Sequence, residues 1–191
     1  MAPLSQELEP PAIPGRFKLT IAVAPRTSRV GVLFNPTNAG KLVELAELRA
    51  AAGVLKIALE PMEVRSTADV EQALARCIQL HCEALITLFD GVTQINQSRI
   101  TQFAAKERLI GIYQVREFAD AGGLITYGLN TCRHFGRAAG YVDRILKGAR
   151  PVDLPVEQPT DFELIINMKA ARELGLTIPP TLLATANVVI E

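Results

Sequence analysis

Short apolar runs alternate with stretches of helical periodicity between residues 29 and 115. The run at 29–35 (RVGVLFN) contains β-branched residues and leads into the turn-forming residues NPTN, as expected for a strand followed by a loop. The positions after it repeat with helical spacing until Gly53 ends the pattern. The same alternation predicts further strands at 55–64, 84–89 and 110–115, and helices at 41–52, after Ser66 and at 95–109.

Strands that are apolar throughout and separated by helices indicate an α/β fold, in which helices cover both faces of a parallel sheet. Pro61 lies inside the second run and has no N–H to donate, so that strand is expected either at an edge of the sheet or broken at Pro61. Ligands of such sheets bind beyond the carboxyl ends of the strands. A binding site is therefore expected among residues 35–38, 90–91 and 113–117.

The pattern changes after the flexible pair Gly122-Gly123. A short strand is predicted at 124–127, and a strongly amphipathic helix at 132–147 is ended by Gly148. A Pro-rich connector at 151–159 leads to a further strand at 162–168 and a helix at 169–174. The tail at 179–191 is predicted to add one helical turn and a last strand.

Composition excludes several classes of function. Lys and Arg balance Asp and Glu at 20 each, so the chain has no electrostatic reason to bind nucleic acid or an anionic membrane. Apolar residues make up 49% of the chain, which suffices for a real core. No apolar run reaches the roughly 20 residues of a membrane helix. The first fifteen residues lack the features of a signal peptide, so the chain as written is expected in the cytoplasm.

Nothing in the sequence supplies a catalytic or metal-binding set. The three cysteines, Cys77, Cys82 and Cys132, are a poor disulfide framework and form no Cys-x-x-Cys pair, so they are interpreted as buried structural thiols. The only histidines are His81 and His134. No Ser-His-Asp order, phosphate-binding glycine loop or metal-ligand pair occurs. We therefore expect a binding protein that is not an enzyme and uses no cofactor or metal.

Three segments carry a resemblance to a known family: VGVLFNPTN at 30–38, VREFADAGGLITYG at 115–128, and YVDRILKGARPVDLPVEQPTDFELIINMKAARELGLTIPPTLL at 141–183. Together they resemble the ABC transporter substrate-binding family associated with tryptophan and tyrosine uptake. The most specific part is the LPVEQP connector, followed by an aromatic strand and an Ala-rich helix that ends in LGLTIPP. The resemblance covers residues 4–191.

The resemblance implies a two-lobed clamshell of the type I periplasmic-binding kind. Family members begin with a signal peptide and a first lobe, so this chain is expected to be truncated to the C-terminal part. It also implies a helix at 16–28, although 20–23 (TIAV) favours a strand by local propensity. The implied domains are an N-terminal extension and crossover (1–28), the substrate-binding lobe (29–121), a crossover strand and helix of the missing first lobe (122–155), and a return to the lobe with the tail (156–191).

By the same resemblance, the chain binds a small molecule for an ABC-type importer, at a periplasmic or extracytoplasmic location. The expected ligand is an amino acid or a similar zwitterion, and the expected protein partner is the membrane subunit of the importer. The helix at 132–147 would pack on the first lobe, so without that lobe its apolar stripe is expected to cause self-association. The alternatives are a truncated product without a transport role, and a receiver-like signalling domain, which would need an acidic pair where Asn35-Pro36 stands.

Six residues at strand ends or near the Gly-Gly pair are candidates for ligand contact: Asn35, Asn38, Asp90, Tyr113, Glu117 and Tyr127. Asparagine amides can donate to a carboxylate or accept from an ammonium group, and an aspartate can pair with an ammonium group.

Each candidate also has a structural interpretation. Asn38 is better explained as a helix cap, and Asp90 is explained equally well as the acceptor of an Asx-turn. Tyr113 lies in an apolar run that is typical of core, and Glu117 can pair with its neighbour Arg116 on the surface. Tyr127 would either cover a ligand or pack on the missing lobe.

Overall fold

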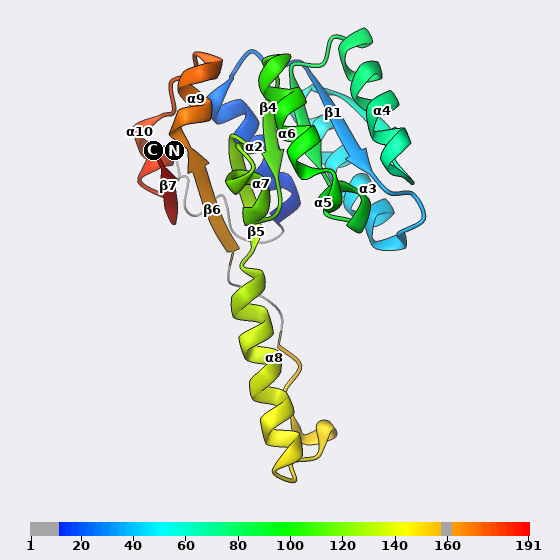
Figure 1. Cartoon of the computed structure of the whole chain (residues 1–191), viewed down its shortest axis with the longest axis vertical. Helices are drawn as coiled ribbons and strands as arrows, with labels where there is room; N and C mark the ends of the chain where they lie inside the picture. Colours follow the sequence, from blue (N-terminus) through cyan, green and yellow to red (C-terminus); the bar gives the residue numbers. More distant parts are fainter. Residues whose placement is uncertain (1–11, 158–161) are drawn as a thin grey trace.

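The structure is a computed structural model that describes residues 12–157 and 162–191. It contains a seven-stranded sheet with helices on both faces (Figure 1). In chain order the elements are α2 (Ala12–Val23), β1 (Arg29–Phe34), α3 (Ala39–Leu55), β2 (Ala58–Glu63), α4 (Thr67–Gln79), β3 (Ala84–Thr87), α5 (Gly91–Ile95), α6 (Gln97–Lys106), β4 (Ile110–Tyr113), α7 (Arg116–Asp120), β5 (Ile125–Leu129), α8 (Thr131–Leu146), a 3-10 turn η1 (Pro151–Asp153), β6 (Phe162–Asn167), α9 (Met168–Leu174), α10 (Pro180–Leu183) and β7 (Val188–Ile190).

The strands follow the order β2-β1-β3-β4-β5-β6-β7. All neighbours are parallel except β5 and β6, which are antiparallel. The chain leaves β1 toward β2 and then returns to β3 on the other side, so the topological switch point lies between β1 and β3. Pro61 pairs with Val32 on the edge strand β2, which confirms the expected edge position.

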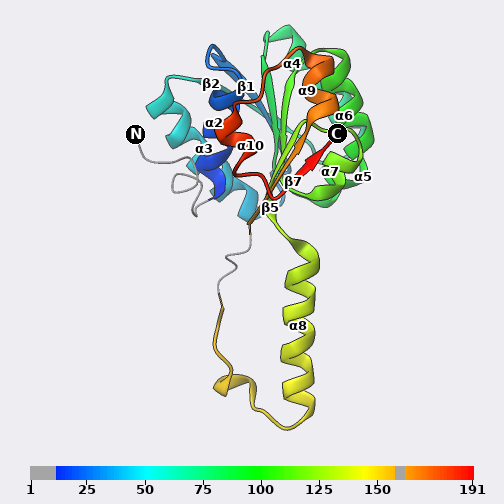
Figure 2. The same ribbon diagram turned by 90° about the vertical axis from the view of Figure 1, so that its left-hand side faces the viewer.

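Alternating side chains on the strands form two cores, one on each face of the sheet. Val30 and Val32 belong to the core that also contains residues of α2, α3, α9 and α10, whereas Leu33 and Leu85 belong to the core that contains residues of α4, α6 and α7. Figure 2 shows α2, α3 and α10 on one side of the sheet and α5, α6 and α7 on the other. The predicted α/β architecture with both faces covered is therefore confirmed.

Most predicted elements occur where the pattern placed them, with several local differences. The short helix α7 was not predicted. The helix at the N-terminus exists although its residues favour a strand, because it packs Phe17 and Leu19 into the core. Helix α3 continues past Gly53 to Leu55 and is capped by Lys56 at φ 57°. The helix expected at 95–109 is α6 at 97–106, and the short helix α5 at 91–95 precedes it, with Asn96 between the two. The expected extension up to residue 11 and the connector at 158–161 lie outside the described residues.

Strand β5 corrects the expected boundary at residue 122. It lies between β4 and β6 within this sheet, with Ile125 and Thr126 in register with β4. The strand therefore belongs to the described lobe, because its backbone completes the ladder between its two neighbours. The remaining division of the chain into lobes stays a prediction.

Helix α8 follows β5 and extends away from the sheet, as Figures 1 and 2 show. None of its residues is buried. The segment after it returns alongside the helix, where the Tyr141 hydroxyl donates to the Pro155 carbonyl at 2.6 Å and Arg137 pairs with Glu157. Within the described ranges, no helix combines the length and apolar character needed to cross a membrane.

Candidate ligand-binding site

A cavity of about 640 Å³ opens at the carboxyl ends of the central strands. Its walls come from α2, the first turns of α3 and α8, the segments after β3 and β4, the end of β5 and the start of β6. Its lining is polar on one side and apolar on the other. The lining residues are Arg16, Lys41, Glu44, Phe89, Gln114, Val115, Gly128, Leu129, Thr131, His134, Phe135, Ala138 and Phe162.

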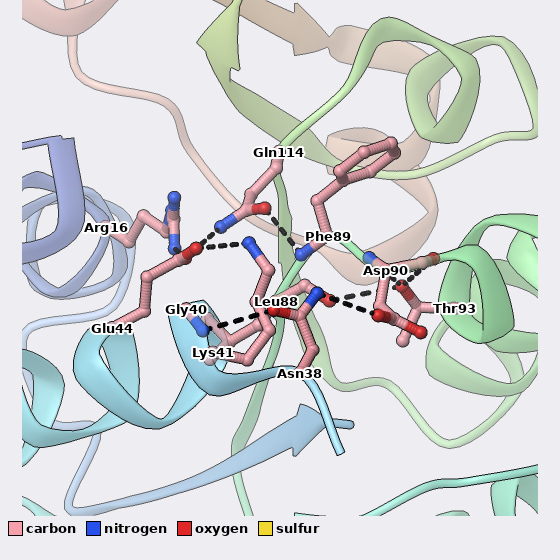
Figure 3. A network of polar contacts seen from close by, with 10 residues as sticks. All are labelled: Arg16, Asn38, Gly40, Lys41, Glu44, Leu88, Phe89, Asp90, Thr93 and Gln114. Carbon is pink, nitrogen blue, oxygen red and sulfur yellow. Dashed lines mark hydrogen bonds and ion pairs between the residues drawn. The ribbon is translucent and has the colours of Figure 1, made fainter. Parts of the chain in front are cut away.

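The polar side of this cavity is organised around Glu44, on the first turns of α3. The carboxylate of Glu44 accepts a hydrogen bond from Gln114 Nε2 at 2.9 Å and one from Lys41 Nζ. The Arg16 guanidinium of α2 lies 3.6 Å away, an ion pair rather than a hydrogen bond. Figure 3 shows these three side chains converging on the carboxylate. Two cations thus face one anion, which leaves this side of the cavity with an excess of positive charge.

Arg16 is unusual because a guanidinium is buried with part of its donor capacity unused. The residue is 4% exposed, and its Nε and Nη1 have no hydrogen-bond partner among the described residues. Burial lowers the pKa of Arg16 to about 10, although Glu44 opposes this effect. The side chain is therefore still a cation at neutral pH. A buried donor without an acceptor is costly, so a carboxylate that enters this corner would relieve that cost.

Gln114 connects this polar group to the end of β3. Its Oε1 accepts a hydrogen bond from the backbone N–H of Phe89, while its Nε2 donates to Glu44. The backbone at Gly128 approaches closely from β5: a β-carbon there would lie 1.9 Å from the Gln114 carbonyl oxygen. Gln114 is therefore held between three elements, and it orients Glu44 toward the cavity.

The structure brings together three of the six predicted residues, beside the cavity rather than in its lining. Asp90 accepts hydrogen bonds from Asn35 Nδ2 at 2.9 Å, Asn38 Nδ2 at 3.2 Å and the Val92 N–H at 3.1 Å. This contact bridges the ends of β1 and β3 across the switch point. Asn38 also caps α3 by accepting from the N–H of Gly40, and Asp90 caps α5. In this structure, the three residues fasten the loops that border the cavity.

Asp90 is expected to contribute stability only while it is ionised. Burial acts to raise the pKa of Asp90, but the bonds from Asn35, Val92 and Asn38 outweigh it and hold the pKa below its ordinary value. A depressed folded-state pKa adds stability above the unfolded pKa of about 3.9, and this stability is lost as the pH falls through the folded value. Asp90→Asn should therefore lower the free energy of unfolding by about 1 kcal/mol at pH 7.

This difference should begin to shrink below about pH 4, where the carboxylate of the unfolded chain takes up a proton, and it should disappear once the pH falls below the lowered pKa of the folded state. Urea unfolding at a series of pH values measures it. Asp120→Asn is the control, because that carboxylate is exposed and forms an ion pair with Arg116 at 3.8 Å. A penalty for Asp90→Asn that is the same at every pH would mean that shape, and not charge, holds the two loops together.

The other three predicted residues lie elsewhere. Tyr113 is 1% exposed and stacks on Phe118, with ring centroids 4.7 Å apart, in the core on the α7 face. Its expected contact with a ligand is wrong for this structure, because the whole side chain is enclosed by protein. Glu117 is exposed on α7 and outside the cavity. Tyr127 is buried and packs on Phe162, so it supports the apolar wall from behind.

Sequence reasoning missed the residues that line the polar side. Gln114 had a usable signal, since an amide at the end of an apolar strand has no role in the core. Arg16 had a weaker one, a cation within an apolar helical stretch. Lys41 and Glu44 had none, because charges on the first turn of a helix are ordinary. Among the described residues, no group of three or more His, Cys, Asp and Glu side chains could hold a metal ion.

A mostly parallel α/β sheet with a half-polar cavity at its strand ends defines a ligand-binding lobe. The chain belongs to the family of ABC transporter substrate binding proteins, which matches residues 11–190. No curated protein matches the chain.

Solved structures share the fold. A conserved domain protein from Vibrio cholerae is 24% identical with a TM-score of 0.85, over 95% of this chain and 60% of that one. The ABC domain from Streptococcus pneumonia in complex with L-Trp is 22% identical with a TM-score of 0.83, over 98% of this chain and 60% of that one. A ligand-free, open substrate binding protein from Clostridium difficile is 18% identical with a TM-score of 0.68, over 93% of this chain and 58% of that one. The chain therefore spans about 60% of their length.

Proposed function

We propose that this chain binds a small zwitterion, an amino acid with an apolar side chain, in the cavity beside Arg16 and Glu44. The observation that carries the proposal is the buried Arg16, whose Nε and Nη1 have no hydrogen-bond partner among the described residues, although Nη1 lies 3.6 Å from the Glu44 carboxylate. It borders a cavity whose lining also contains apolar side chains. The neighbour from Streptococcus pneumonia, which holds L-Trp, supports the same ligand class.

The charged groups of an amino acid match the polar side of the cavity, and its apolar side chain matches the apolar wall. The excess positive charge of Arg16 and Lys41 suits a carboxylate, for which a guanidinium offers two parallel donors. Glu44 supplies the counter-charge for an ammonium group. The apolar wall suits an uncharged side chain and consists of Phe89, Val115, Leu129, Phe135, Ala138 and Phe162.

The cavity is open on one side, which limits the affinity of the chain alone. Phe89 is 36% exposed, Leu129 37% and Phe135 71%. Small-molecule sites that bind tightly bury about 70–90% of their ligand. We therefore expect roughly millimolar dissociation constants, and tighter binding if a second lobe closes over the site.

A titration followed by NMR tests this proposal, because it detects weak binding and reports on Arg16 Nε–H directly. L-tryptophan and L-leucine should shift the Arg16 signal, whereas L-lysine and L-glutamate should not. Tryptophan amide lacks the carboxylate and N-acetyl-tryptophan lacks the ammonium group, so both should bind less well than tryptophan. No shift with any amino acid, or equal binding of all six compounds, would contradict the proposal.

The wider role that we propose is delivery of this ligand to the membrane subunit of an ABC importer, outside the cytoplasm. Membership of the substrate-binding family supports this role. The amino-acid ligand and the importer partner are separate parts of the proposal, so each needs its own test. Co-purification with the cognate membrane subunit, in the presence and absence of L-tryptophan, addresses the second part.

We also propose that the chain, as given, dimerises through α8. The uncovered face of this helix, beyond the cavity, is a stripe of Ala139, Val142 and Leu146, and its two large side chains are 54% and 82% exposed. The other apolar side chains face the returning segment. Such a stripe is self-complementary when two copies pair across a two-fold axis, and fully burying each large side chain contributes about 1.5–3 kcal/mol.

Light scattering across a concentration series should then show a dimer that dissociates on dilution. Val142→Glu should give a monomer at every concentration, because it places a charge at the centre of the stripe. Arg133→Glu is the matched control, since it changes an exposed residue on the opposite face of α8. A wild-type monomer throughout the series would refute the proposed dimer.

A further inference from the structure

The backbone conformation at the C-terminal end of α4 brings Cys77 and Cys82 close together. His81 adopts a left-handed conformation at φ 54°. Its N–H donates to the Ile78 carbonyl at 2.9 Å, and the Cys82 N–H donates to the Cys77 carbonyl at 3.0 Å. This pair of bonds is a Schellman motif, in which Cys77 and Cys82 occupy the two positions whose side chains the motif brings into contact.

The separation of the two backbones suits a disulfide. The bond of 3.0 Å between the Cys82 N–H and the Cys77 carbonyl, with standard covalent geometry, keeps the two Cα atoms within about 7 Å. Disulfides join Cα atoms that are about 4.4–6.8 Å apart. The constraint that a disulfide would impose is therefore one that the folded helix end already satisfies.

The two sulfur atoms also converge on one point in the core. A β-carbon built on Gly31 would lie 3.0 Å from Cys77 Sγ and 3.5 Å from Cys82 Sγ, so both thiols face the same backbone position on β1. The absence of a side chain at Gly31 creates the space that both thiols occupy. The third cysteine, Cys132, is exposed on α8 and distant in sequence.

We propose that Cys77 and Cys82 form a redox-active pair that closes to an intramolecular disulfide, joining the end of α4 to the segment that begins β3. The oxidant is a small-molecule disulfide such as oxidised glutathione. The Cys82 thiolate attacks one sulfur of the oxidant and releases the first glutathione thiolate. Cys77 then displaces the second glutathione from Cys82, and its proton passes to the departing thiolate. Two protein thiols and one oxidised glutathione thereby become one protein disulfide and two reduced glutathiones.

Cys82 is the better first nucleophile of the two for two reasons. It is 7% exposed, whereas Cys77 is 0% exposed. The interaction with the neighbouring Cys77 thiol holds the pKa of Cys82 below its usual value, whereas the interaction with Cys82 together with burial raises the pKa of Cys77. Cys82 is therefore the thiol that a disulfide reagent reaches, and Cys77 is positioned to resolve the mixed disulfide.

The test uses the whole chain with Cys132→Ser, which removes the exposed third thiol. Reduced protein is equilibrated with mixtures of reduced and oxidised glutathione, alkylated and digested with trypsin. Both cysteines lie in one tryptic peptide, residues 77–99, so the internal disulfide appears as an unalkylated peptide lighter by two hydrogen atoms. The equilibrium constant for its formation should be at least about tenfold higher in the folded chain than in guanidinium.

A second variant and a thermal melting experiment test the same proposal without relying on the mass of the tryptic peptide alone. With Cys77→Ala added, Cys82 should stop at the mixed disulfide with glutathione. The oxidised pair should raise the melting temperature by a few degrees. Alkylation of both thiols at every glutathione ratio, mixed disulfides only, or an equilibrium constant no higher in the folded chain than in guanidinium would each overturn the proposal.

Discussion

Replacing Tyr113 with alanine should lower the free energy of unfolding by about 3–5 kcal/mol, the range for removing a large aromatic side chain from a core. The ring stacks on Phe118 and fills the space that two glycines leave open. A β-carbon on Gly111 would lie 2.2 Å from the Tyr113 hydroxyl oxygen, and one on Gly123 would lie 2.7 Å from its ring. Because protein surrounds the side chain completely, its loss leaves a cavity that the sheet cannot collapse to fill.

Chemical unfolding of Tyr113→Ala and Tyr113→Phe separates the ring from the hydroxyl. The phenylalanine variant keeps the stacked ring and should change stability by less than about 1 kcal/mol. Amino-acid binding per folded molecule should be unchanged in both. Normal stability with lost binding would instead restore Tyr113 as a ligand contact.

Replacing Arg16 with methionine should weaken binding of L-tryptophan by at least about tenfold. The apolar stem of methionine fills the space in α2 but removes the cation that faces the ligand carboxylate, and charge-assisted hydrogen bonds contribute about 1.5–3 kcal/mol each. Glu44 keeps its hydrogen bonds from Lys41 and Gln114 in the variant, so the polar side of the cavity should retain its shape.

Binding of tryptophan amide distinguishes loss of the carboxylate contact from general damage to the cavity. This analogue has no carboxylate, so Arg16→Met should affect it little. Arg26→Met, an exposed position beyond the end of α2, is the control for the loss of one positive charge. Equal weakening for tryptophan and its amide would show that Arg16 shapes the cavity without contacting the ligand.

The local sequence pattern was sufficient to predict the strands and most helices, because the spacing of apolar residues indicates which positions are buried. The edge strand β2 was predictable from Pro61 alone, since a residue without an N–H cannot complete a ladder on both sides. Helix α2 was not predictable from propensity: its TIAV segment favours a strand, and only the resemblance to the family indicated a helix. Its packing through Phe17 and Leu19 overrides the local preference.

The sequence by itself determined the α/β architecture, the family and the edge of the sheet at which a cavity would form. Each of these follows from periodicity or from contiguous motifs, and both features can be recognised in the sequence itself. Only the tertiary structure decided which side chains line the cavity. Arg16, Glu44 and Gln114 lie on α2, on α3 and after β4, and no local pattern relates them. Asp90 was predicted as a ligand contact from its position at a strand end. In the structure its carboxylate accepts a hydrogen bond from Asn35 and thereby links two loops. Tyr113 shows the same limit, because successive side chains of a strand point to opposite faces, and which neighbours enclose each face depends on how the chain packs.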